Sequence, residues 1–485
     1  MRDGQGSFDN WAVSTGQPLA VRAAVETIKR GGTAVDAAIA ADAVLGVVEP
    51  MATGIGGDLL AMVVEPGGRC VSYNGSGRSS MHLDVLEVQS LPNGKIPERS
   101  PLAITVPGAV QGWWDLHQRY GRLPWPNLFI DAIRAARDGF PVQAVTAREW
   151  SVFASVLRDD TDATRIYRAD NIPRVGSIFN NQALAQCLRS IATEGPGAFY
   201  RGPWAEAVAA KCVQIGSPLR MDDMASHRGE FVEPLVTRFK GVDVYECPPN
   251  THGLGVLEAL TILDGRHLDE RDPMSRVEMV MAMEQGLEHA RSVVTDPSGN
   301  TVCTVIVDEK GLAVSLMSSI FKRFGSGFVV PEAGFVLQNR GFGFSRIGML
   351  NGASPGRRPY HTVIPAATTR NGRFHSVFGV VGGAMQPQGH VQLLTQVVAW
   401  GKAPQAGIDA PRWRLEGARQ LAVEAAMPGT ITSALRNAGF SEPAAGIGEL
   451  AGRSDFGGAQ MVMRSDSGNL LAGSDRRKDG HAAGA

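Results

Sequence analysis

Hydrophobic and polar positions follow two different patterns along the chain. Before about residue 300, helical periodicity alternates with short apolar runs. Residues 18–32 have the apolar spacing of an amphipathic helix that two glycines end, and residues 33–50 are so apolar and alanine-rich that we expect a buried helix. Residues 59–74 predict two strands around a Pro-Gly-Gly turn, and residues 108–142 predict two helices joined by a turn.

After residue 300, strands dominate the pattern. Runs rich in valine, isoleucine and threonine are separated by glycine-containing turns, the first of them at Asp308–Gly311. We expect strands at 301–307, 312–318, 327–337, 361–368 and 374–381, a helix near 388–400, and further strands to about residue 472. The final KDGHAAGA is expected to be frayed. Helices and strands in both halves predict an α+β fold with helical layers on mainly antiparallel sheets.

A polar pair, Asn300 and Thr301, stands at the start of the first of these strands. It follows a Pro-Ser-Gly turn at residues 297–299. Asparagine is common in turns and threonine in strands, so residue types alone give the pair an ordinary structural explanation.

Composition narrows the setting. The chain has 485 residues, of which 44% are hydrophobic and 20% charged, with a formal net charge of −1. This is a soluble globular composition that gives no support for nucleic acid or an anionic membrane as partner. The five cysteines are odd in number and without a CxxC motif, and the ten histidines show no ligand spacing. We therefore expect no disulfide framework, metal or cofactor, and, without a signal peptide or membrane span, a cytoplasmic location.

Two glycine-rich stretches are candidates for chemistry. GIGGD at residues 54–58 follows a predicted helix and precedes a predicted strand, which is the reverse of the order in a dinucleotide-binding fold. In VVGGAMQPQGH, at residues 380–390, a strand runs through two glycines into a helix. Backbone N–H groups at such a junction can hold a negatively charged oxygen, although on this stretch alone a plain strand-to-helix turn is the favoured explanation.

Seven stretches, taken in order, resemble the gamma-glutamyltransferase family over residues 18–480. They are RGGTAVDAAIAADAVLGVVEPMATGIGGD, VPGAVQGWW, NTVCTVIVDEKGLAVSL, FGSGFVVPEAGFVLQNRG, RRPYHTVIP, VVGGAMQPQGH and GSDRRKDG. The LQNRG and GGAMQPQGH stretches are more similar to the subgroup that includes oxamate amidohydrolase. The resemblance implies an N-terminal-nucleophile αββα sandwich, in which a large segment, 1–300, and a small segment, 301–485, form one fold.

The resemblance also implies a precursor that cuts itself before a threonine, here between Asn300 and Thr301. A threonine hydroxyl is a poor nucleophile until a base takes its proton. Cleavage would free the α-amine of Thr301, and the ordinary pKa of an α-amine, roughly 7.7–8.0, leaves a useful neutral fraction near pH 7. One residue would then supply both the nucleophile and the base.

Further site residues follow from the resemblance. Gly382 and Gly383 match the oxyanion hole, and Ser319 matches a hydroxyl residue that orients the threonine. The residues that match or resemble substrate-binding positions are Arg78, Asn339, Arg340, His361 and Thr362. For Arg78 a solvated loop arginine, and for His361 a hydrogen-bonded core histidine, are equally good explanations.

The chain departs from the family at three places. The loop Gly341–Gly343 carries no carboxylate where gamma-glutamyl enzymes bind the substrate ammonium, and Ile320 and Phe321 replace polar residues. Only SVVTDPSGN separates the preceding helix from Thr301, where relatives have several dozen residues.

These features predict an amide hydrolase or acyltransferase that acts through a threonyl ester on a small carboxylate-bearing amide. Oxamate-type amides are favoured over gamma-glutamyl compounds of the glutathione hydrolase type. Two alternatives stay open: a cephalosporin-type acylase, and an unprocessed, inactive paralogue that acts as a folded or binding protein. We expect the two fragments of an active enzyme to remain together as a heterodimer, and higher oligomers are an open question.

Overall fold

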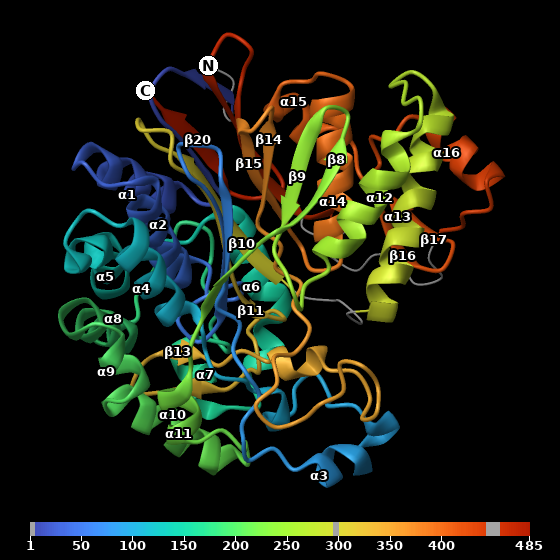
Figure 1. The fold of residues 1–485 in the computed structure, drawn as a ribbon. Coiled ribbons are helices and arrows are strands. Elements are labelled where there is room, and N and C mark those ends of the chain that lie inside the picture. The colour runs from blue at the N-terminus through green and yellow to red at the C-terminus, as the bar shows by residue number, and fades with distance from the viewer. Residues whose placement is uncertain (1–4, 294–299, 443–455) are drawn as a thin grey trace.

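The computed structural model describes residues 5–293, 300–442 and 456–485. The predicted turn at residues 297–299 lies outside the described residues. Two seven-stranded antiparallel sheets stack face to face between layers of helices (Figure 1). This architecture confirms the αββα prediction.

Each sheet takes strands from both sides of Asn300. The first sheet has the order β1 (Gln5–Phe8), β19 (Leu470–Ser474), β18 (Gly458–Arg464), β15 (Arg373–Val381), β14 (Ala366–Arg370), β9 (Val242–Glu246) and β8 (Leu235–Phe239). The second sheet has the order β20 (His481–Gly484), β2 (Ala12–Thr15), β10 (Asn300–Val307), β11 (Ala313–Phe321), β3 (Asp58–Val64), β4 (Cys70–Asn74) and β7 (Glu230–Val232).

Alternation along the strands divides the core into layers. In β10, Cys303 and Val305 point toward the first sheet, where they meet Val377 and Val381 of β15. Val302 points the other way, into a helical layer. This period of two follows from the pleat of a strand and explains why β10 is apolar on both faces.

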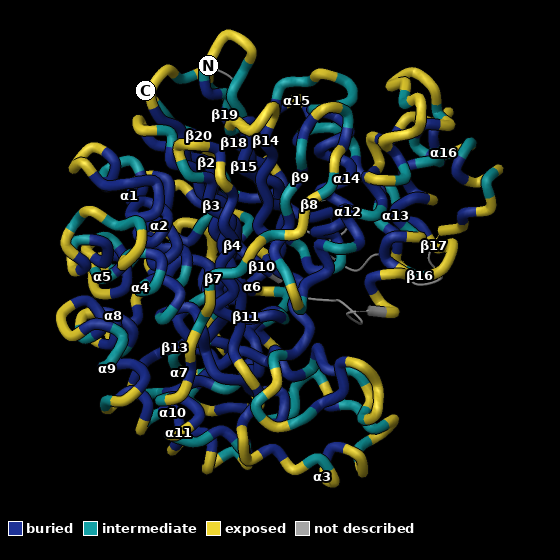
Figure 2. Tube along the Cα trace, in the orientation of Figure 1, coloured by how far each residue is buried: buried dark blue, intermediate teal, exposed yellow. Residues whose placement is uncertain are grey.

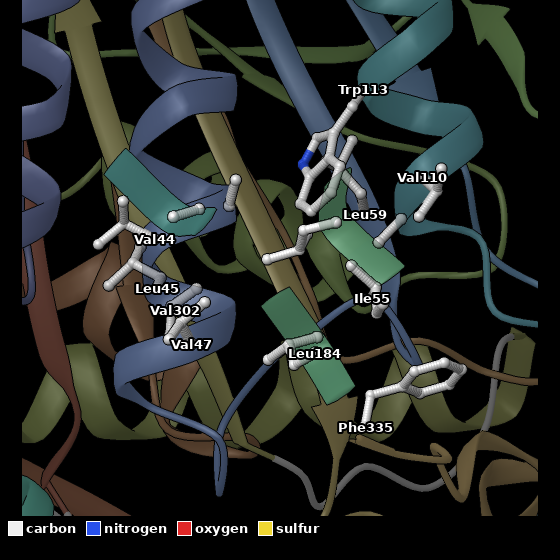
Figure 3. Close-up of a cluster of buried hydrophobic side chains, with 14 of the residues drawn as sticks. Val44, Leu45, Val47, Ile55, Leu59, Val110, Trp113, Leu184, Val302 and Phe335 are labelled. Atoms are coloured by element: carbon white, nitrogen blue, oxygen red, sulfur yellow. The ribbon is translucent and has the colours of Figure 1, made fainter. Parts of the chain in front are cut away.

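The helices cover the two outer faces. Those on the side of the second sheet include α1 (Pro18–Lys29), α2 (Ala34–Val48), α4 (Ala109–Tyr120), α5 (Ile130–Asp138) and α8 (Gln182–Glu194), and those on the side of the first include α12 (Gly253–Asp264), α13 (Pro273–Val293) and α14 (Met385–Leu394). The predicted helix at 33–50 is α2, which is buried except at Gly46. It begins at a capping box between Thr33 and Asp36. Its Val44, Leu45 and Val47 pack beside Val302 (Figure 3), and the tube of Figure 2 is buried along most of both sheets.

Three local expectations are wrong. The C-terminal tail is not frayed: its residues 481–484 form β20, which pairs with β2 through backbone hydrogen bonds that its small side chains did not reveal. The strand expected at 327–337 is two short strands, β12 (Val329–Val330) and β13 (Phe335–Val336), because the chain turns between them, where Gly334 N–H donates to the Val330 carbonyl. The strand expected at 361–368 begins only at Ala366, so His361 and Thr362 precede it.

None of the helices within the described residues has both the length and the apolar character needed to cross a bilayer.

Candidate active site

Thr301 lies opposite an irregularity in β11. Asn300 pairs with Phe321 and Val302 pairs with Ser318, so Thr301 alone faces Ser319 and Ile320. This is a β-bulge, a feature that redirects side chains and is frequent beside active sites. Phe321 ends the bulge with a φ of 76°, a left-handed conformation that costs a non-glycine residue about 1–3 kcal/mol.

The Thr301 side chain is held from α14. Thr301 is 1% exposed, and its Oγ1 accepts a hydrogen bond from Gln386 Nε2 at 2.7 Å. Gln386 lies in the first turn of α14, where Met385 N–H and Gln386 N–H donate to the carbonyls of Gly382 and Gly383. The strand–glycine–glycine–helix junction predicted from the sequence therefore lies beside Thr301 and contacts it through Gln386. Both glycines have positive φ, 117° and 60°.

Ser319 is oriented by two donors. Its Oγ accepts hydrogen bonds from Phe321 N–H at 2.9 Å and from Arg340 Nη2 at 3.1 Å. The two lone pairs of the hydroxyl oxygen are thereby occupied, so toward any further group the hydroxyl acts as a donor. The Arg340 guanidinium also lies over the Phe321 ring, 4.2 Å from its centroid, which stabilises the bulge from one side.

Asp58, at the start of β3, is the centre of a buried polar cluster. Its Oδ1 accepts hydrogen bonds from Gly77 N–H at 2.8 Å and Gln338 Nε2 at 2.9 Å. Its Oδ2 lies 3.2 Å from His361 Nε2 and 3.7 Å from Arg340 Nε. The preceding residue, Gly57, approaches β11 so closely that a Cβ would lie 2.4 Å from the Ser319 carbonyl oxygen. The GIGGD turn therefore brings Asp58 beside the bulge.

The protonation states within this cluster follow from its contacts. Val363 N–H donates to His361 Nδ1, so the ring proton is on Nε2 and His361 donates to Asp58. Burial, with the Arg340 charge, lowers the pKa of His361 to about 4. Burial raises the pKa of Asp58, but its hydrogen bond from His361 and the nearby positive charge outweigh this, and the pKa is lowered overall. Burial lowers the pKa of Arg340 to about 9, which still leaves it charged at neutral pH.

The structure gathers some of the predicted substrate-binding residues and not others. Arg340, His361 and Thr362 are fully buried, and Arg340 Nη1 lies 3.5 Å from Thr362 Oγ1. Asn339 uses both ends of its amide, accepting from Lys322 N–H and donating to the Glu98 carbonyl. Arg78 is exposed and donates to the Gly356 carbonyl. The substrate-binding roles of all five residues stay predictions.

Sequence reasoning missed two residues that contact this site. Asp58 was visible as a carboxylate at the head of the apolar strand DLLAMVV, where a charge needs a buried partner. Gln386 was visible as a glutamine in the first turn of a helix that is buried along its length.

A metal is not needed to explain these contacts. Asp58 Oδ2 lies beside both His361 Nε2 and Arg340 Nε, so protein groups surround this carboxylate oxygen. Elsewhere in the described residues, His82, Asp222 and Asp223 have metal-ligating atoms within reach of one another. His82 pairs with Asp222 at 3.0 Å on the exposed surface, and the buried Asp223 accepts hydrogen bonds from Ser80 and Met81.

Comparison with known proteins identifies a matching family model and relatives that are similar over most of this chain. A family model described as gamma-glutamyltranspeptidase matches residues 20–299 and 281–485. An oxamate amidohydrolase proenzyme from Klebsiella pneumoniae subsp. pneumoniae is 32% identical over 517 residues, which cover 96% of this chain and 97% of the relative. A glutathione hydrolase-like proenzyme from Bacillus subtilis is 31% identical, with coverage of 96% and 97%.

A solved structure extends this similarity to the whole fold. The crystal structure of a cephalosporin acylase from Bacillus halodurans has a TM-score of 0.93 and 33% sequence identity with this chain. The match covers 100% of this chain and 97% of that chain.

Proposed function

The chain belongs to the gamma-glutamyltranspeptidase family, and we propose that it is a self-processing amide hydrolase with Thr301 as its nucleophile. The observation that carries the proposal is the hydrogen bond from Gln386 to Thr301 Oγ1, at the end of the glycine–glycine junction and opposite the Ser319 bulge. N-terminal sequencing of the smaller fragment tests the proposal, because that fragment must begin at Thr301.

Self-cleavage would proceed through an ester. Thr301 Oγ adds to the carbonyl carbon of Asn300, the C–N bond breaks, and the nitrogen takes up a proton to become the free α-amine. Water then opens the ester to leave a carboxylate on Asn300 and a hydroxyl on Thr301. Because each sheet contains strands from 1–300 and from 301–485, separation would break both sheets. This interleaving supports the prediction that the fragments stay together as a heterodimer.

Turnover would use the same groups. The α-amine of Thr301 removes the hydroxyl proton, Oγ attacks the substrate amide, and the amine or ammonia leaves as an acyl ester forms. The N–H groups of Gly382 and Gly383 are the proposed donors to the oxyanion. Ser319, held by Phe321 and Arg340, is the proposed positioning residue for the amine.

The substrate we propose is a small amide that carries a carboxylate, of the oxamate type. Of the two predicted arginines, Arg78 is exposed, whereas Arg340 is fully buried beside Asp58. A substrate carboxylate therefore reaches Arg78 more readily, and Arg340 acts through Ser319. The relative from Klebsiella pneumoniae supports the oxamate class, and the similarity to cephalosporin acylase supports acylase activity as the second candidate.

Substrate preference gives the first prediction. A gamma-glutamyl group has an ammonium for which loop 341–343 provides no carboxylate, whereas oxamate has none. We expect kcat/KM for ammonia release from oxamate-type amides to exceed that for a gamma-glutamyl anilide by about 10- to 100-fold, the cost of an unmade charged hydrogen bond. Both substrates are to be assayed on one preparation shown by gel to be cleaved. A preference for the anilide would mean that another acidic residue reaches the ammonium.

Gly383 gives the second prediction. In Gly383→Ala, the added Cβ strains a backbone with φ of 60° and misdirects an N–H of the proposed oxyanion hole. We expect kcat to fall by about 10²–10³-fold, the usual effect of losing one such donor. Gly401→Ala is the matched control, because Gly401 has a φ of 66° and open space around its Cβ position. Full turnover by folded Gly383→Ala would remove the glycine from the oxyanion hole.

A further inference from the structure

We propose that Gln386 is a catalytic residue that stabilises Thr301 Oγ as the leaving group when the threonyl ester opens. This inference rests on the proposed function and adds a residue that neither the family resemblance nor the sequence pattern identified. It follows from the direction of one buried hydrogen bond and from the electron flow at Oγ.

The direction of the hydrogen bond is settled by a second contact. Gln386 Oε1 accepts a hydrogen bond from Ile364 N–H at 3.2 Å. A backbone N–H can only donate, so this contact fixes which end of the amide is oxygen. The other end, Nε2, carries two hydrogens and no lone pair to share, and it therefore donates to Thr301 Oγ1 at 2.7 Å. Gln386 is fully buried, which keeps the amide in this orientation.

A hydrogen-bond donor at Thr301 Oγ accelerates some steps of the reaction more than others. When Oγ attacks a carbonyl carbon, its electron density moves into the new bond and the hydrogen bond weakens. When the ester opens, the C–Oγ bond breaks and density returns to Oγ, so the hydrogen bond strengthens. Gln386 therefore accelerates ester opening most, both in self-cleavage and in turnover.

The ester-opening step balances without any further reactant. Water adds to the ester carbonyl carbon and gives one proton to the α-amine of Thr301. The carbon–Oγ bond then breaks, its electron pair stays on Oγ, and the ammonium returns the proton to Oγ. The products are a carboxylic acid and the free Thr301 hydroxyl, with Gln386 donating to Oγ throughout.

The same helix provides a matched control. Gln388 is also buried, but its Oε1 accepts from Leu415 N–H at 2.7 Å and its Nε2 donates to the Ala384 carbonyl at 2.9 Å. Gln388 thus attaches α14 to β16 (Trp413–Gly417) and has no bond to Thr301 among the described residues. Gln388→Met removes an equivalent amide from the same helix and reports any general loss of packing.

The experiment follows cleavage of freshly made wild type, Gln386→Met and Gln388→Met with and without neutral hydroxylamine. We expect Gln386→Met to form its two fragments, as separated on a denaturing gel, about 10- to 100-fold more slowly than wild type, the usual effect of losing one hydrogen bond at a reacting atom. Hydroxylamine, which attacks esters, should restore cleavage and leave a hydroxamate at Asn300, identified by mass. In turnover, kcat and KM should fall together while kcat/KM changes little, because the acyl ester accumulates.

Each outcome decides between the two proposals. If wild type cleaves and Gln386→Met behaves as Gln388→Met does, or if hydroxylamine does not rescue it, the inference is overturned and the proposed function stands. If wild type yields no fragments even with hydroxylamine, both are overturned. If Gln386→Met does not fold, Gln386→Glu replaces it: a buried glutamic acid is a donor only while protonated, so its defect must grow with rising pH. A pH-independent defect contradicts the inference.

Discussion

Replacing Thr301 by alanine is expected to leave one uncleaved chain without amide hydrolase activity. The substitution removes the hydroxyl oxygen that Gln386 holds in the site, and Ser319 is not an equivalent hydroxyl, because its Oγ already accepts from Phe321 and Arg340. Nucleophile and general base are lost together, since the α-amine is never freed. A denaturing gel after long incubation, N-terminal sequencing and an ammonia-release assay measure the result.

Two variants separate this effect from a loss of structure. Thr304→Val changes a threonine of the same strand that is equally buried and bonds to Thr15, so it should destabilise the sheet without preventing cleavage. Thr301→Ser keeps a hydroxyl and should retain slow processing. If wild type itself remains a single band and Thr301→Ala is indistinguishable from it, the chain is the inactive paralogue.

The periodic pattern of hydrophobic residues predicted the main helices and strands of the fold. The helix at 33–50 and the strands from 301 and 312 could be placed because their side-chain pattern reports burial directly. Strand β20 could not, because a short run of histidine, alanines and glycine has no such pattern and is held by pairing with β2. The β11 bulge was also invisible, since it depends on the register between two strands rather than on either strand alone.

The candidate site was predicted unevenly for a similar reason. Thr301 and Ser319 came from motif resemblance, because their types alone are ordinary for strands. His361 and Asp58 are 303 positions apart, and nothing local to either identifies the other. Arg340 was expected at the substrate, and that role stays a prediction; its burial beside Asp58 and its bond to Ser319 depend on long-range contacts that no local pattern shows.

Disrupting the buried polar cluster around Asp58 is expected to have a large effect on stability. Asp58→Asn removes the negative charge while leaving Arg340 fully buried and charged. Breaking a buried pair in this way costs about 3–5 kcal/mol of the free energy of unfolding. Urea unfolding at pH 7 measures the loss, and it should be done in the Thr301→Ala chain so that both proteins are uncleaved.

Two controls assign the loss to the unpaired charge. Asp58→Asn combined with Arg340→Met removes both charges and should recover part of the lost stability, because the uncompensated guanidinium is gone. Asp138→Asn removes an aspartate that pairs with Arg137 on the exposed surface, and it should change stability little. A double variant no more stable than Asp58→Asn would show that hydrogen bonds to Asp58, rather than its charge, stabilise the cluster.

The pH dependence gives an independent signature of the same charge. Because the pKa of Asp58 is lower in the folded chain than the value of about 3.9 expected when unfolded, its ionised form stabilises the fold above that value. As pH falls through 4 and further toward the folded pKa, protonation removes this contribution. The stability difference between Thr301→Ala and its Asp58→Asn derivative should therefore be full at pH 7 and shrink below about pH 4. A difference that stays constant down to the limit of folding would show that the Asp58 charge is not what stabilises the buried Arg340.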